Sequence, residues 1–147
     1  MQTVEGFEFP DERYYESSQH LWVRPDAANR LLVGIDRLGL EALGDLAYVS
    51  LHAVGGRVAQ GEAVGTLEAA KMTTDIASPV SGLIVERNDD VVRDPLLVNR
   101  DPYDNGWLVV LEPERWESEC VDFVSGPAIA HWATSEIQRY RNEGLID

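Results

Sequence analysis

A chain of 147 residues with 44% hydrophobic residues is long enough to fold as one domain around a single core. Its formal net charge of −14 argues against binding to nucleic acid or to an anionic membrane surface, because both need clustered cations. Its single cysteine, Cys120, excludes a disulfide framework within the chain and a cysteine-rich metal site.

The first segment in chain order, residues 1–13, is predicted to be irregular, with Phe7 and Phe9 as anchors in the core. It lacks the basic stretch followed by an apolar stretch that marks a secretory leader. No later apolar run is long enough to span a membrane. We therefore expect a cytoplasmic protein.

Short apolar runs separated by turn-forming residues predict a mainly β protein. The expected strands are residues 19–24, 30–35, 46–51, 63–67, 74–77, 83–86 and 107–111. A short helix is expected between an N-cap at Asp36 and a closing Gly44, and a single helical turn after Asp94-Pro95. Residues 88–90 are predicted to form a loop. Strands at such short intervals are typical of a small barrel or sandwich.

The C-terminal part of the chain is predicted to be helical. Residues 114–123 indicate a short helix, and a longer one is expected from Pro127 to Asn142. Four apolar side chains recur at helical spacing on the longer helix: Ile129, Trp132, Ile137 and Tyr140. We expect a domain of residues 1–113 and a helical extension of residues 114–147 packed on it.

Lys71 is the only lysine in the chain, since the other eleven basic residues are arginines. It lies between two expected strands, so it should stand at the tip of a hairpin with its amine in water. That position suits a lysine to which an enzyme attaches a prosthetic group, although an ordinary solvated lysine also explains it. The histidines lack metal-ligand spacing and no nucleotide-binding or nucleophile motif is present. We expect no active site of the chain's own.

Four stretches between about Tyr14 and Pro113 resemble the H protein of the glycine cleavage system, a lipoyl carrier. They are His20–Trp22, Val33–Asp36 followed by Ala42–Asp45, Glu68–Gly82 and Leu97–Trp107. The third stretch is similar to the lipoylation hairpin of the family, with a glutamate three residues before the lysine and a glycine eleven residues after it. The fourth is similar to a segment that lipoyl domains of 2-oxoacid dehydrogenases and biotin carriers do not have.

The resemblance implies a hybrid barrel-sandwich of two antiparallel sheets with short flanking helices, and lipoate attached covalently to Lys71. It also makes Glu68 a candidate for recognition by the lipoylating enzyme, a lipoate ligase or an octanoyltransferase; an exposed strand residue is the alternative reading. Biotin is the competing cofactor, because biotin carriers place Met-Lys-Met at the same tip. Met72 fits that pattern but Ala70 does not.

Three departures from the family pattern bear on which enzymes use the lipoyl arm, here called the client enzymes. They are Met72 after the lysine, Gly39-Leu40 in the short helix, and the residues after Pro113, where the family is expected to end. On these grounds we favour an H-like lipoate-binding protein that serves sulfur oxidation with heterodisulfide-reductase-like partners. The first alternative is a glycine cleavage H protein that carries the aminomethyl group between glycine decarboxylase and aminomethyltransferase and is reoxidised by dihydrolipoyl dehydrogenase. An unmodified binding module is the second alternative.

Overall fold

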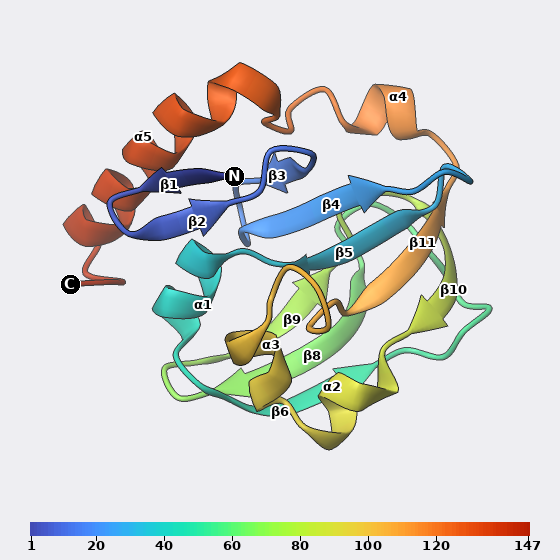
Figure 1. The fold of residues 1–147 in the computed structure, drawn as a ribbon. Helices are drawn as coiled ribbons and strands as arrows, with labels where there is room; N and C mark the ends of the chain where they lie inside the picture. Colours follow the sequence, from blue (N-terminus) through green and yellow to red (C-terminus); the bar gives the residue numbers. More distant parts are fainter.

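Three antiparallel sheets form the framework of the computed structural model, which describes residues 1–147 (Figure 1). The strands are β1 (Gln2–Val4), β2 (Phe7–Phe9), β3 (Tyr14–Glu16), β4 (Leu21–Pro25), β5 (Leu31–Ile35), β6 (Leu46–Leu51), β7 (Arg57–Val58), β8 (Ala63–Ala69), β9 (Thr73–Ala77), β10 (Gly82–Arg87) and β11 (Val109–Pro113). One sheet has the order β3-β4-β5-β11-β10-β7 and a second the order β6-β8-β9. The β1-β2 hairpin is the third.

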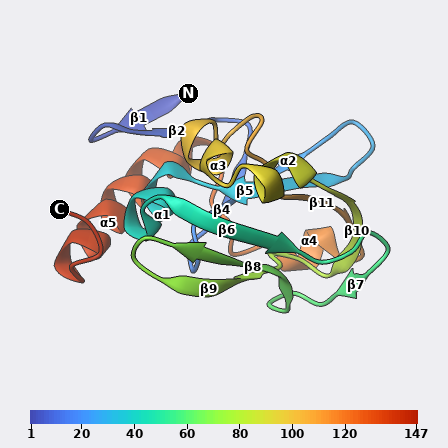
Figure 2. The same ribbon diagram turned by 90° about the horizontal axis from the view of Figure 1, so that it is seen from below.

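The two larger sheets enclose the main core. Figure 2 shows β6, β8 and β9 as a layer across from the larger sheet. Their inward-facing side chains alternate with outward-facing ones and meet in one cluster of buried apolar residues, which includes Val23, Val33, Leu111, Val49, Leu67 and Ile76. The predicted mainly β fold of the barrel-sandwich type is confirmed, and so are all seven expected strands to within a few residues.

The helices are short except for the last. They are α1 (Arg37–Leu43), α2 (Asp89–Arg93), α3 (Leu96–Arg100), α4 (Trp116–Glu119), the 3-10 turn η1 (Gly126–Ala128) and α5 (Ile129–Asn142). The predicted ends of α1 are confirmed, because the Asp36 carboxylate accepts a hydrogen bond from the Gly39 N–H and Gly44 closes the helix with φ 79°. None of the helices combines the length and the apolar composition needed to cross a membrane.

Two predictions of irregular structure are wrong. The N-terminal segment forms the β1-β2 hairpin, whose turn residues Glu5 (φ 49°) and Gly6 (φ 89°) both adopt positive φ, as in a type I′ turn. Glutamate rarely takes that conformation, so the turn gave no sequence signal.

The predicted loop at 88–90 begins α2, because the Asn88 side chain accepts a hydrogen bond from the Asp90 N–H at 3.1 Å. The helix predicted over 114–123 is shorter, since α4 spans only Trp116–Glu119.

The last helix packs on the outer face of the larger sheet and runs beside β1 and β2 (Figure 1). Of the four side chains predicted to pack, Ile129, Ile137 and Tyr140 are buried and Trp132 is partly buried. They join Phe9, Tyr15, Trp22 and Leu38 in a second apolar core. The helix is therefore part of the folded unit, while the division of the chain at residue 113 stays a prediction.

Candidate functional site

Lys71 stands at the tip of the hairpin that joins β8 and β9. The two strands pair antiparallel up to Glu68 and Thr73, and the Ala69 N–H donates to the Met72 carbonyl at 2.8 Å, which closes a tight turn around Ala70 and Lys71. The Lys71 side chain is exposed. The structure therefore places the chain's single lysine where a modifying enzyme can reach it, as the sequence predicted.

The backbone of this tip is fixed against the end of α1. The Lys71 N–H donates to the Leu43 carbonyl at 3.0 Å, and the neighbouring Ala70 N–H donates to the Asp45 carbonyl at 2.9 Å. Gly44 lies between these two acceptors, and a Cβ at that position would stand 3.2 Å from the Ala70 Cβ. A side chain at Gly44 would thus press on the tip and would also have to adopt a positive φ. The lysine projects from a rigid support.

The amine itself is held loosely. Its Nζ donates one hydrogen bond, to the Glu41 carbonyl at 3.0 Å, at an exposed position. An amide formed at Nζ keeps one N–H donor and loses the positive charge. Glu41, Asp45 and Glu68 all carry exposed side chains, so acylation would leave this end of the molecule more negative. Glu68 lies on β8 opposite Tyr48 and Thr73, and its role in recognition by a lipoylating enzyme stays a prediction.

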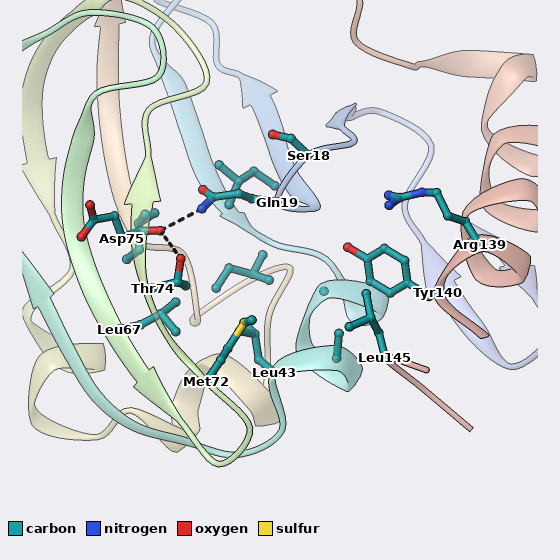
Figure 3. A pocket seen from close by; sticks show the side chains of 15 residues that line it. Ser18, Gln19, Leu43, Leu67, Met72, Thr74, Asp75, Arg139, Tyr140 and Leu145 are labelled. Atoms are coloured by element: carbon teal, nitrogen blue, oxygen red, sulfur yellow. Dashed lines mark hydrogen bonds between the residues drawn. The ribbon is translucent and has the colours of Figure 1, made fainter. Parts of the chain in front are cut away.

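An open cleft of about 260 Å³ begins beside the tip (Figure 3). Met72, the residue after Lys71, and Leu43, the acceptor for its N–H, both line it. Figure 3 shows Tyr140, in the last turn of α5, and Leu145, which follows the helix, across from them. Most lining residues are apolar, among them Leu21, Ile35, Leu67 and Ile76. An apolar cleft next to an exposed lysine fits an acyl chain that ends in a dithiolane ring, so the residues present suit lipoate.

The far rim of the cleft is polar and fixed by one side chain. The Gln19 amide donates to the Asp75 carbonyl (Figure 3) and accepts from the Ala77 N–H, both at 2.8 Å. These two bonds tie β9 to the segment that precedes β4. The hairpin is thus anchored at its tip by α1 and along β9 by Gln19, which gives the cleft a defined wall on this side.

A buried histidine behind the cleft is the main feature that sequence reasoning missed. His20 is fully buried with φ 57°, and its Nδ1 lies 2.8 Å from Asp36 Oδ2 while its Nε2 lies 2.8 Å from Glu136 Oε1. A ring nitrogen can bond an ionised carboxylate only by donating, so both nitrogens carry a proton and the ring is an imidazolium. Since 116 residues separate His20 from Glu136, no local pattern could have revealed the pair.

The charges around His20 explain its protonation. Burial lowers the pKa of His20, but the negative charge of Asp36 and the hydrogen bonds to Asp36 and Glu136 outweigh burial and raise that pKa to about 9. For the carboxyl of Glu136, burial acts in the other direction and raises the pKa. Hydrogen bonds from His20 and Arg139 outweigh burial and lower that pKa to about 2. At neutral pH Glu136 is therefore ionised, and it bonds two cations, the imidazolium of His20 and the guanidinium of Arg139.

Comparison with known proteins gives consistent matches. Residues 13–133 match the family model described as Glycine cleavage H-protein. The chain is 43% identical over 106 residues to a glycine cleavage system H protein of Thermus thermophilus, covering 72% of this chain and 81% of the relative. It is 38% identical over 112 residues to one of Coprothermobacter proteolyticus, covering 76% and 83%.

The solved structures include a similar fold. A glycine cleavage system H protein from Mycobacterium marinum superposes with a TM-score of 0.72 at 35% identity, covering 86% of this chain and 99% of that one. The family match runs past Pro113 through α4 and into α5. The expectation that the family ends soon after Pro113 is therefore wrong; that stretch carries no motif, so its membership could not be read from the sequence alone.

Proposed function

Because the chain belongs to the glycine cleavage H-protein family, we propose that it is the lipoyl carrier of a glycine cleavage system and that Lys71 bears the lipoate. Proteins of this family carry lipoate covalently on a lysine and have no catalytic activity of their own. The observation that carries the assignment to Lys71 is that the only lysine of the chain stands exposed at the tip of an anchored hairpin.

When attached, lipoate supplies a two-electron disulfide/dithiol couple that opens and closes by thiol exchange. The contribution of the chain is placement. Leu43 and Asp45 hold the tip backbone through their carbonyls, so the point of attachment does not move with the arm. The cleft beside Met72 offers apolar surface to the arm, and the acidic surroundings of the tip favour client enzymes with basic docking faces. Biotin fits this assignment less well, since the relatives are lipoyl carriers.

The relatives support a different set of client enzymes from the one that the sequence departures favour. Met72, Gly39-Leu40 and the residues after Pro113 are the only grounds for sulfur oxidation with heterodisulfide-reductase-like partners. The family match across α4 and into α5 removes the last of these reasons, and glycine cleavage H proteins are the relatives that support a client. The proposed partners are therefore glycine decarboxylase, aminomethyltransferase and dihydrolipoyl dehydrogenase, together with a lipoate ligase or octanoyltransferase. The unmodified binding module has no observation in its favour.

Glycine–bicarbonate exchange tests this proposal. The lipoylated protein, mixed with glycine decarboxylase, should support exchange of the glycine carboxyl group with labelled bicarbonate, whereas the unlipoylated protein should not. An authentic H protein assayed with the same decarboxylase is the positive control. Lipoylated protein that leaves exchange at background in that setting would overturn the glycine-cleavage client and revive a specialised one.

A further inference from the structure

The buried His20 contacts both sides of the cleft beside Lys71. On the α1 side it bonds Asp36, the N-cap of α1, and a Cβ placed on Gly39 would stand 3.0 Å from the His20 Cβ. On the α5 side it bonds Glu136. Gly39 lines the cleft from α1, while Arg139 and Tyr140 line it from α5. A single imidazole thus joins the two helices between which the cleft opens.

The α5 side is connected to His20 by more than one contact. The Tyr140 ring lies edge-on to the imidazole at 4.9 Å and the Trp132 ring stacks on it at 5.2 Å. Arg139 donates to both carboxylate oxygens of Glu136, at 2.7 and 3.1 Å, and its guanidinium covers the Tyr140 ring at 4.9 Å. Of the two cleft residues of α5, Tyr140 therefore contacts the buried ring directly, and Arg139 is held to it through Glu136.

We propose that His20, as an imidazolium, is a positioning residue for the carrier: it latches α5 onto the N-terminus of α1 and so sets the wall of the cleft that shelters the loaded end of the Lys71 arm from water. This inference rests on the proposed function and deepens it. The arm is the occupant because the cleft starts at Met72 and Leu43, which adjoin the attachment point.

The charges facing His20 make the latch depend on its protonation. Asp36 lies on the α1 side, and Glu136 and Arg139 lie on α5. Tyr15, Tyr103 and Tyr140 are the other titratable groups that interact electrostatically with Asp36. A neutral imidazole has one donor and can bond only one of the two carboxylates. Asp36 would keep the Gly39 N–H and Glu136 would keep Arg139, so the loss of one proton loosens α5 without leaving either carboxylate unpartnered.

The chain offers a matched pair of variants for the test. Glu136→Gln removes one negative charge from α5 and Glu143→Gln removes one from its C-cap. Both side chains bond Arg139, but only Glu136 contacts His20. One readout is independent of the cofactor: nitrogen-15 NMR of the three histidines. The signals of His20 are identified as the ones that disappear in His20→Gln. At pH 7 the wild type and Glu143→Gln should show His20 with both nitrogens protonated, and Glu136→Gln should show a His20 that titrates at lower pH.

The second readout is how long the loaded carrier keeps its cargo. Hydrolysis breaks the carbon–sulfur bond with one water molecule, restores the thiol and releases formaldehyde and ammonia, so formaldehyde measures the loss. Glu136→Gln should release formaldehyde about fivefold faster than the wild type at pH 7, the effect of one lost charge-assisted hydrogen bond on the closed position of α5. Glu143→Gln should match the wild type.

Equal release from the two variants, or a neutral His20 in the wild type at pH 7, would overturn the latch. A carrier that takes up no cargo from glycine would instead contradict the proposed function. In that case the NMR comparison alone decides whether His20 is the protonated link between α1 and α5.

Discussion

Replacing Trp132 with alanine should lower the free energy of unfolding by about 3 kcal/mol, at the lower end of the range for a Trp-to-Ala change because the ring is only partly buried. The ring packs between Phe9, Tyr15 and His20 at centroid distances of 5.7, 5.3 and 5.2 Å, and its Nε1 donates to Ser17 Oγ at 2.8 Å. For a domain of this size the melting temperature should fall by roughly 6–12 °C.

Trp132→Phe is the control for this change. It keeps an aromatic ring in the second core and loses the bond to Ser17, so it should cost only about 1 kcal/mol. Thermal unfolding followed by circular dichroism measures both variants. An unchanged melting temperature for Trp132→Ala would mean that α5 does not contribute to the stability of the folded unit.

The second large effect is a loss of stability in mild alkali. The pKa of His20 is about 9 in the folded chain and about 6.5 when unfolded, so folding favours the protonated ring. Its contribution is fully present below pH 6.5 and is lost as the pH rises through 9. Integrated over that window, the free energy of unfolding should fall by about 3 kcal/mol. Denaturant titrations at pH 6.5 and at pH 9 measure the difference.

The titration of His20 can be separated from that of other groups. In His20→Gln the fall between pH 6.5 and pH 9 should disappear, although the protein starts from a lower stability. The raised pKa of Tyr140, about 12, acts only at higher pH. Glu136 behaves in the opposite sense, because its lowered pKa of about 2 gives a contribution that is lost only in strong acid. An alkaline loss that persists in His20→Gln would assign the effect elsewhere.

The sequence predicted the parts of the fold that rest on local chemistry. The apolar runs that became strands, the Asp36 and Gly44 caps of α1 and the lysine turn all depend on residues within a few positions of one another. The β1-β2 hairpin escaped prediction because its turn places Glu5 at a positive φ, and the contacts that hold the hairpin are distant in sequence: Phe9 packs in the second core and Arg141 bonds Glu5.

Only the part of the site that depends on neighbouring residues could be predicted from the sequence. The position of Lys71 at the hairpin tip follows from neighbouring residues, but the cleft beside it is assembled from α1, β4, β9 and α5, which lie far apart in the sequence. The link from His20 to Glu136 spans 116 residues and depends on where α5 lies on the sheet. Periodicity showed which face of α5 is apolar; it could not show that the charged residue on that face would meet a buried histidine.

Intact-mass measurement of the protein after reaction with a lipoylating enzyme tests the central claim, that Lys71 carries the lipoate. The wild type should gain the mass of one lipoyl group and Lys71→Arg should gain none. A double variant, Lys71→Arg with Arg30→Lys, puts the only lysine at the exposed end of the β4-β5 turn and should also stay unmodified, because that turn lacks the anchored tip. A lipoyl group on Lys71→Arg, or a biotin-sized addition to the wild type, would contradict the account.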